Sequence, residues 1–191
     1  NEIIKEPFLS FYLSQILTNF PNSQIVFILR DPFQNIRSIL NRLKIPGNLD
    51  SLELFEWPEL NKTPVWKLSL QSTMLGFNSC NYIQAMAFRW NFLVNLFKKN
   101  TSTCTLVKYE DFNLDKEACI KSLSKELSLE HLKDISEIKD KQFQPKGNAN
   151  VNLYDFFGAQ NFNLIYEMCQ ENLELFYPDL VRPPNFSAKK K

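Results

Sequence analysis

The segment that most restricts the fold is QIVFILR, residues 24–30, which stops abruptly at Asp31 and Pro32. A continuous apolar run with β-branched residues is typical of a parallel strand covered on both faces. Asp31 suits the N-cap of a helix and Pro32 its first turn. The sequence therefore predicts a strand, a turn and a helix. The buried stripe of that helix consists of Ile36, Ile39, Leu40 and Leu43.

The rest of the chain alternates between strand and helix patterns. "EIIKEP" at the start resembles a strand end, and "TCTLVKYEDF" predicts a second buried strand that ends at Tyr109. Helices are expected over residues 7–19, 82–99, 114–127 and 162–176, with short helices and loops over 44–80. The inward side of the helix over 114–127 is expected to carry Ala118, Ile120, Leu123 and Leu127. This alternation predicts an α/β fold with a mainly parallel sheet flanked by helices.

Length and composition limit the function classes. A chain of 191 residues with 44% hydrophobic residues can bury the core of one domain, expected over residues 1–182, before a disordered tail at 183–191. The net charge of +1 supplies no global field for nucleic acid or anionic lipid. No apolar stretch approaches 18 residues, so no membrane-spanning segment is expected. The four cysteines, which we interpret as buried thiols, are Cys80, Cys104, Cys119 and Cys169.

Arg30 and Ser38 are the first candidates for a binding site. Ligands of open α/β sheets bind outside the carboxyl ends of the strands, where Arg30 is expected. Ser38 follows eight residues later on the next helix. A guanidinium together with a hydroxyl suits a phosphate monoester. The structural alternative is an arginine paired with Asp31 or with a neighbouring helix.

Three further places carry candidate binding residues. Lys5 lies at the turn in "KEP", where a lysine can neutralise a leaving anion, although an exposed lysine is the simpler reading. Tyr109 ends the second strand, where its ring can pack on a base or against the core. Lys146 and Gly147 lie in "QPKGNAN", a loop whose backbone N–H groups can surround a phosphate, and such pairs are also common without a function.

Together these segments resemble the sulfotransferases that use 3′-phosphoadenosine 5′-phosphosulfate (PAPS). The likeness runs in the family's order from "KEPF" through "FPNSQIVFILRDPFQNIRSIL" and "KYEDF" to "QPKG". Arg-Asp-Pro after a strand, with a serine eight residues beyond the arginine, matches the family's 3′-phosphate motif. The Lys-x-Pro turn is similar to that of the tyrosylprotein and carbohydrate branches. The resemblance implies a P-loop-NTPase-like sulfotransferase fold.

The resemblance also implies roles for the candidate residues. Arg30 and Ser38 would bind the 3′-phosphate, and Tyr109 would lie near the adenine. Lys5 would act on the leaving group as a catalytic residue. The late nucleotide-binding loop would contribute Lys146 and Gly147.

Some parts of the family pattern have no counterpart in these 191 residues. No GxxxxGK pattern stands for the loop that binds the 5′-phosphosulfate, and Glu6 and Pro7 replace the histidine of the cytosolic branch. The general base, which related enzymes take from a glutamate upstream of the lysine turn, is unassigned. The one histidine, His131, is interpreted as structural. We therefore expect an N-terminally truncated chain, the C-terminal two-thirds of such an enzyme.

The expected activity is transfer of a sulfuryl group from PAPS to a hydroxyl on a carbohydrate, a tyrosine or a small molecule, with 3′-phosphoadenosine 5′-phosphate (PAP) as the second product. No metal is expected. Residues 44–80, with Trp57 and Trp66, form the expected acceptor side, although core packing explains both tryptophans equally well. The main alternative is a catalytically incomplete nucleotide-binding or protein-interaction remnant of the same fold. A nucleoside-phosphate kinase fits less well. The oligomeric state and the compartment both stay open, and the two options for the compartment are the cytoplasm and, if a membrane anchor lies upstream, the Golgi lumen.

Overall fold

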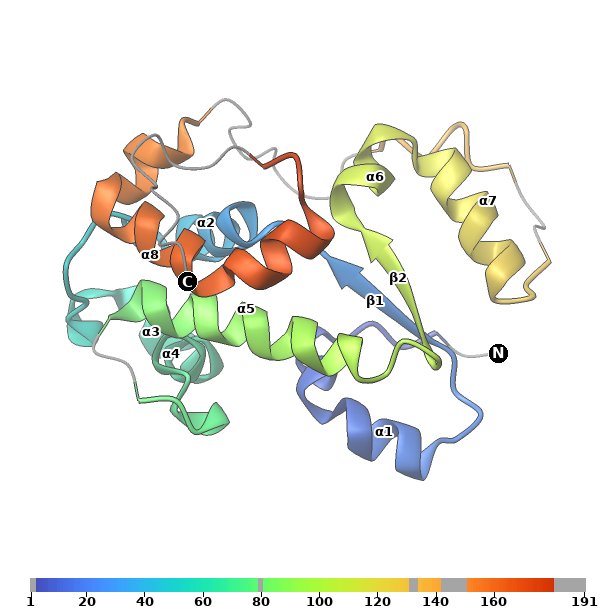
Figure 1. Cartoon of the computed structure of the whole chain (residues 1–191), viewed down its shortest axis with the longest axis horizontal. Coiled ribbons are helices and arrows are strands. Elements are labelled where there is room, and N and C mark those ends of the chain that lie inside the picture. The colour runs from blue at the N-terminus through green and yellow to red at the C-terminus, as the bar shows by residue number, and fades with distance from the viewer. Residues whose placement is uncertain (1–2, 79–80, 131–133, 142–150, 181–191) are drawn as a thin grey trace. The chain divides into compact units, whose positions relative to one another are not determined.

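A computed structural model describes residues 3–78, 81–130, 134–141 and 151–180 (Figure 1). The fold is α/β, with 61% helix and a two-stranded parallel sheet flanked by helices, as the alternating sequence pattern predicts. The chain divides into two compact units: residues 1–30 with 93–145, and residues 31–92 with 146–191. Cys80, His131, Lys146, Gly147 and the predicted tail at 183–191 lie outside the described residues.

The first unit contains the sheet. Strand β1 (Ile25–Leu29) pairs in parallel with β2 (Cys104–Lys108), and the register runs from Ile25 opposite Cys104 to Leu29 opposite Lys108 (Figure 1). Both strands lie where the sequence predicts them. The second strand ends at Lys108 because Tyr109 begins helix α6 (Tyr109–Leu114).

The predicted strand end at residues 3–6 is wrong. These residues are neither strand nor helix, and β1 pairs only with β2 in the described part of the chain. A strand needs a neighbour for its hydrogen-bond ladder, and here the Glu6 side chain instead accepts a hydrogen bond of 3.1 Å from the backbone N–H of Phe8. That cap begins the 3₁₀ helix η1 (Pro7–Tyr12), which continues as α1 (Leu13–Asn19) and so covers the predicted helix.

The two faces of β1 are buried unequally, which corrects the expectation of a strand covered on both faces. Phe27 is 8% exposed and Leu29 is 3% exposed, and the Phe27 ring lies 5.3 Å from the ring of Phe97 in α5 (Tyr82–Lys98). Ile28 is 63% exposed. Successive side chains of a strand point to opposite faces, so the protein covers mainly the face that carries Phe27.

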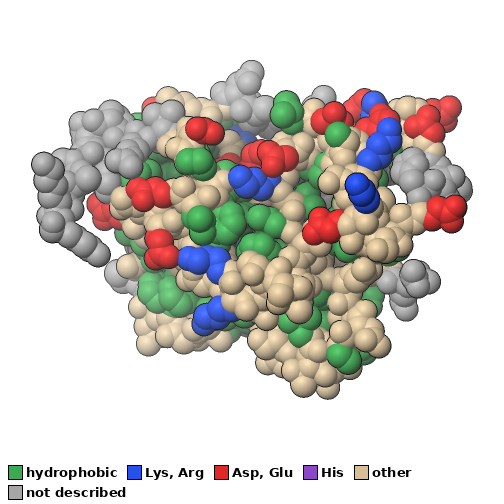
Figure 2. Space-filling view, turned by 45° about the vertical axis from the view of Figure 1, so that its right-hand side comes forward, with side chains coloured by type: hydrophobic (Ala, Val, Ile, Leu, Met, Phe, Trp, Pro, Cys, Tyr) green, Lys and Arg blue, Asp and Glu red, His purple; other side chains and the backbone are tan. Residues whose placement is uncertain are grey.

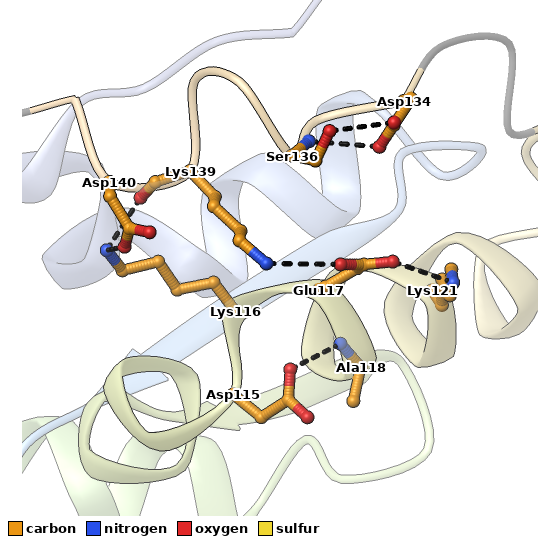
Figure 3. A network of polar contacts seen from close by, with 9 residues as sticks. All are labelled: Asp115, Lys116, Glu117, Ala118, Lys121, Asp134, Ser136, Lys139 and Asp140. Atoms are coloured by element: carbon orange, nitrogen blue, oxygen red, sulfur yellow. Dashed lines mark hydrogen bonds and ion pairs between the residues drawn. The ribbon is translucent and has the colours of Figure 1, made fainter.

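Helix α7 (Lys116–Glu126) takes part in a network of polar contacts (Figure 3). The Asp115 carboxylate accepts a hydrogen bond from Ala118 N–H at 3.0 Å and caps the helix. The ammonium group of Lys139 lies 3.4 Å from Glu117, and that of Lys116 donates to the Lys139 carbonyl at 2.6 Å. These contacts fasten the turn that contains Lys139 to the helix.

The predicted inward side of α7 is wrong at one position and weaker than expected at the others. Ala118 is exposed, whereas Ile120, Leu123 and Leu127 are half-buried, and no residue of the helix is fully buried. The pattern gives the correct side of the helix, but few described residues pack against it.

The second unit is helical and has a deeper core. Helix α2 (Pro32–Leu43) begins as predicted, because the Asp31 carboxylate accepts a hydrogen bond of 2.9 Å from Gln34 N–H. The predicted stripe of α2 is buried, and this helix packs against α8 (Leu153–Phe176). The Phe33 ring contacts the rings of Phe157 and Phe162 of α8, with centroid distances of 6.2 and 4.5 Å.

Helix α8 starts earlier than the predicted helix over 162–176 and contains an interruption at Gly158. Gly158 has φ 68° and ψ 163°, a conformation that essentially only glycine adopts. Asn161 lies in α8 just beyond this interruption, and its side chain donates hydrogen bonds to the carbonyls of Gly47 and Leu49 at 2.8 and 3.0 Å. A buried amide therefore ties α8 to the loop that follows α2.

Residues 44–80 form short helices and loops, as predicted. The elements are η2 (Leu54–Glu56), α3 (Pro58–Lys62), α4 (Pro64–Gln71) and η3 (Thr73–Leu75). They lead into the long helix α5, which the sequence places correctly. The Tyr82 hydroxyl donates to the carbonyl of Pro46 at 2.5 Å, and burial raises the pKa of Tyr82 to about 12.

The mixed surface charge agrees with the composition, and the prediction of buried thiols is confirmed for Cys104 and Cys169 but not fully for Cys119. Lys and Arg are interspersed with Asp and Glu on the face seen in Figure 2, as a net charge of +1 suggests. Cys104 and Cys169 are buried free thiols, Cys119 is half-buried, and burial raises the pKa of each. None of the described helices is both long enough and apolar enough to cross a membrane.

Candidate functional site

Arg30 and Tyr109 meet at the carboxyl end of the sheet. Each is the residue directly after its strand, and the last pair in the ladder is Leu29 opposite Lys108. The two residues therefore continue the register by one step. Paired residues of a parallel ladder project to the same face, so adjacent strand ends bring the arginine and the tyrosine together.

The guanidinium of Arg30 lies over the ring of Tyr109. The guanidinium carbon of Arg30 lies 4.6 Å from the centroid of the Tyr109 ring, within the range of a cation–π interaction. Arg30 is half-buried, and Tyr109 is 38% exposed. The backbone of Tyr109 is fixed as the first residue of α6, and its carbonyl accepts a hydrogen bond of 2.9 Å from the side-chain amide of Asn113.

This arrangement puts a fixed positive charge at the edge where α/β folds bind ligands. A guanidinium presents its N–H groups in a planar fork that matches two oxygens of a phosphate or a carboxylate. The chemistry that this pair supports is therefore recognition of a tetrahedral or planar oxyanion beside an aromatic ring.

The other described candidates, Lys5 and Ser38, are both exposed. Lys5 is exposed in the segment before η1 and makes no hydrogen bond or ion pair with any described residue. Ser38 is exposed on α2, which belongs to the second unit, whereas Arg30 belongs to the first. The roles of Lys5 and Ser38 stay predictions, as do those of Lys146 and Gly147.

A cavity of about 290 Å³ lies along β2 and the two helices that follow it. It is lined by residues 105–108, by Asp111 and Asp115, and by the side of α7 that carries Cys119 and Glu126. Its charged lining has three carboxylates and one lysine, so it does not suit a phosphate. The pKa of the Cys119 thiol is raised by burial, and then by the charges of Asp111 and Asp115.

No pattern in the sequence predicts this cavity. Asp111 lies within α6, and Asp115 is the residue between α6 and α7, where an aspartate ordinarily predicts only a helix cap. Asp115 indeed caps α7. Arg30 and Tyr109 do not line the cavity, so their contact and the cavity are separate features of the first unit.

The tryptophans of the predicted acceptor side are half-buried in the second unit. The guanidinium carbon of Arg89 lies 5.8 Å from the Trp66 ring centroid, and burial lowers the pKa of Arg89 to about 10. The indole N–H of Trp57 is buried and has no hydrogen-bond acceptor among the described residues. Their role toward an acceptor stays a prediction. The described residues contain no group of three or more His, Cys, Asp or Glu side chains arranged to hold a metal ion.

No protein-family model, curated protein or solved structure matches the chain. The resemblance to sulfotransferases therefore depends on the motifs in the sequence. The Arg30–Tyr109 stack is the geometric feature that bears on it most directly.

Proposed function

We propose that this chain is part of a PAPS-dependent sulfotransferase with the P-loop-NTPase-like fold of that family. The observation that carries the proposal is the stacking of Arg30 on Tyr109 at the carboxyl end of two parallel strands. The Arg-Asp-Pro and Tyr-Glu-Asp motifs supply these two residues, and both follow their strands directly. An oxyanion-binding arginine at this edge suits the 3′-phosphate that distinguishes PAPS from simpler adenine nucleotides.

In the proposed reaction the protein mainly positions and neutralises, as in phosphoryl transfer. Arg30 binds the 3′-phosphate of the donor. The acceptor hydroxyl gives its proton to a general base, its oxygen bonds to sulfur, and the bond from sulfur to the 5′-phosphate oxygen breaks. Lys5 neutralises the charge that builds on that leaving oxygen, and PAP is released.

Calorimetric titration of the chain with PAP tests the binding step. Arg30→Ala is expected to weaken PAP binding about 10- to 100-fold, because a charge-assisted hydrogen bond contributes roughly 1.5–3 kcal/mol. Arg42→Ala is the matched control, since Arg42 is an exposed arginine in the last turn of α2. Equal PAP affinity of wild type and Arg30→Ala would refute the assigned phosphate contact.

The alternative is a nucleotide-binding or protein-interaction remnant of the same fold. It is favoured by the absence of a GxxxxGK pattern from these 191 residues. Transfer of labelled sulfate from PAPS to a panel of glycans, tyrosine peptides and phenols separates the two. Transfer supports the enzyme, whereas PAP binding without transfer to any acceptor supports the remnant.

A further inference from the structure

We infer that Tyr109 is a positioning residue, whose ring holds the Arg30 guanidinium in place for the 3′-phosphate. This inference rests on the proposed function and refines it. The sequence resemblance puts the tyrosine near the adenine. The geometry instead puts a face of its ring against an arginine, at 4.6 Å.

The tyrosine is well suited to fix another side chain because its own backbone is fixed. It is the first residue of α6, preceded in the sheet by the last residue of β2, Lys108. Asn113, one turn further along α6, donates a side-chain hydrogen bond to the Tyr109 carbonyl. The ring therefore extends from a point where a strand and a helix both restrain the chain.

The restraint matters because it limits the rotamers of the Arg30 side chain. An unrestrained arginine has many rotamers, and ordering it reduces the affinity gained from each phosphate contact. Stacking against the ring restricts those rotamers before the ligand arrives.

The same contact limits what else the ring can do. The face of Tyr109 that meets Arg30 cannot also stack on a base. A contact with adenine would have to use the opposite face or the edge of the ring, within the 38% of the residue that is exposed. The two roles therefore predict different dependences on the 3′-phosphate.

Titrations with PAP and with adenosine 5′-phosphate, which lacks the 3′-phosphate, separate these roles. Tyr109→Leu should weaken PAP binding about tenfold, the order of a cation–π contact, and leave adenosine 5′-phosphate binding within about twofold. Tyr109→Phe keeps the ring and should bind PAP within about twofold of wild type. In an Arg30→Ala background, Tyr109→Leu should cause no further loss of PAP affinity.

Equal PAP binding by wild type and Tyr109→Leu overturns the positioning role and leaves the proposed function intact. Parallel losses for both nucleotides also overturn it, because they indicate a contact with the adenine. Failure of wild type to bind PAP overturns the proposed function itself.

A measurement without nucleotide tests directly whether the Tyr109 ring contacts the Arg30 side chain. The side-chain Nε–H signal of Arg30 in an NMR spectrum, assigned by its loss in Arg30→Ala, should carry a ring-current shift in wild type and in Tyr109→Phe. Tyr109→Leu should remove that shift. An unchanged signal in Tyr109→Leu overturns the inference.

Discussion

The two compact units of this chain are stabilised in different ways. The second unit buries α2, α5 and α8 side chains deeply, including Phe33 at 1% exposure, and adds buried amide hydrogen bonds from Asn161. The first unit has a two-stranded sheet with one open face, and neither α6 nor α7 has a buried residue. Exposed ion pairs add polar contacts on its surface.

The difference bears on where a binding site can lie. Segments with few buried contacts open and rearrange more easily than deep cores, and ligand-binding elements are often drawn from them. The Arg30–Tyr109 stack and the cavity along β2 both belong to the less buried unit. We therefore expect the second unit to be the more rigid of the two and the first to open more easily.

The largest expected effect comes from replacing one phenylalanine in each unit. Phe33→Ala should lower the free energy of unfolding by about 3–5 kcal/mol, because it leaves a cavity between α2 and the rings of Phe157 and Phe162. Phe27→Ala should cost at least about 1 kcal/mol less, because Phe27 is more exposed and lies in the thinner core. Urea unfolding followed by circular dichroism measures both. Equal losses would mean that the two cores are packed alike.

The next effect concerns the buried amide of Asn161. Asn161→Ala leaves the carbonyls of Gly47 and Leu49 without their donor, which should cost about 1–3 kcal/mol. Gln160→Ala is the control, since Gln160 is an exposed neighbour on the same helix. The same unfolding assay applies. A cost for Asn161→Ala no larger than that of Gln160→Ala would show that the loop does not depend on this amide.

Local patterns in the sequence predict most of the elements because each carries its own signal. The run at 24–30, the Asp31 cap and the stripe of α2 all depend on neighbours a few residues apart, and all are confirmed. The strand at residues 3–6 and the second covered face of β1 depend on partners distant in sequence. Periodicity cannot report whether such partners exist, and both expectations are wrong.

In the candidate site, too, local patterns are predicted correctly and contacts between distant segments are not. The sequence predicts that Arg30 and Tyr109 each lie at the end of a strand, and in the structure each directly follows one of two paired strands. Their stacking was not predicted, because it depends on the register between strands about 80 residues apart in sequence. The cavity was missed since its lining combines an edge of β2 with α7, two elements whose individual patterns indicate only a strand and an amphipathic helix.

A smaller effect tests the open face of the sheet. Ile28→Thr keeps a β-branched residue in the strand and should change the free energy of unfolding by less than about 0.5 kcal/mol, since Ile28 is 63% exposed. Leu29→Ala, one residue further along β1, should cost several times more because Leu29 is buried. A large loss for Ile28→Thr would mean that this face is covered in solution.

The smallest effect concerns Glu117, which accepts from Lys121 at 2.9 Å and from Lys139 at 3.4 Å. The hydrogen bond from Lys121, followed by that from Lys139, lowers the pKa of Glu117, and Glu117 in turn raises the pKa of Lys121. A lowered carboxyl pKa stabilises the folded protein above the unfolded value of about 4.3, and this contribution is lost as the pH falls through the folded pKa. A raised lysine pKa stabilises below about 10.4 and loses its contribution as the pH rises through the folded pKa.

Glu117→Gln should therefore lower the thermal unfolding midpoint slightly between about pH 5 and 10, and the difference from wild type should shrink toward both extremes. The pairs are exposed, so the difference should also shrink in about 1 M NaCl, where the Debye length is about 3 Å. Glu130→Gln removes an exposed glutamate outside the network and should show neither dependence. A pH-independent difference for Glu117→Gln would mean that its ion pairs do not help to hold α7, and the first unit would then depend on its small buried core alone.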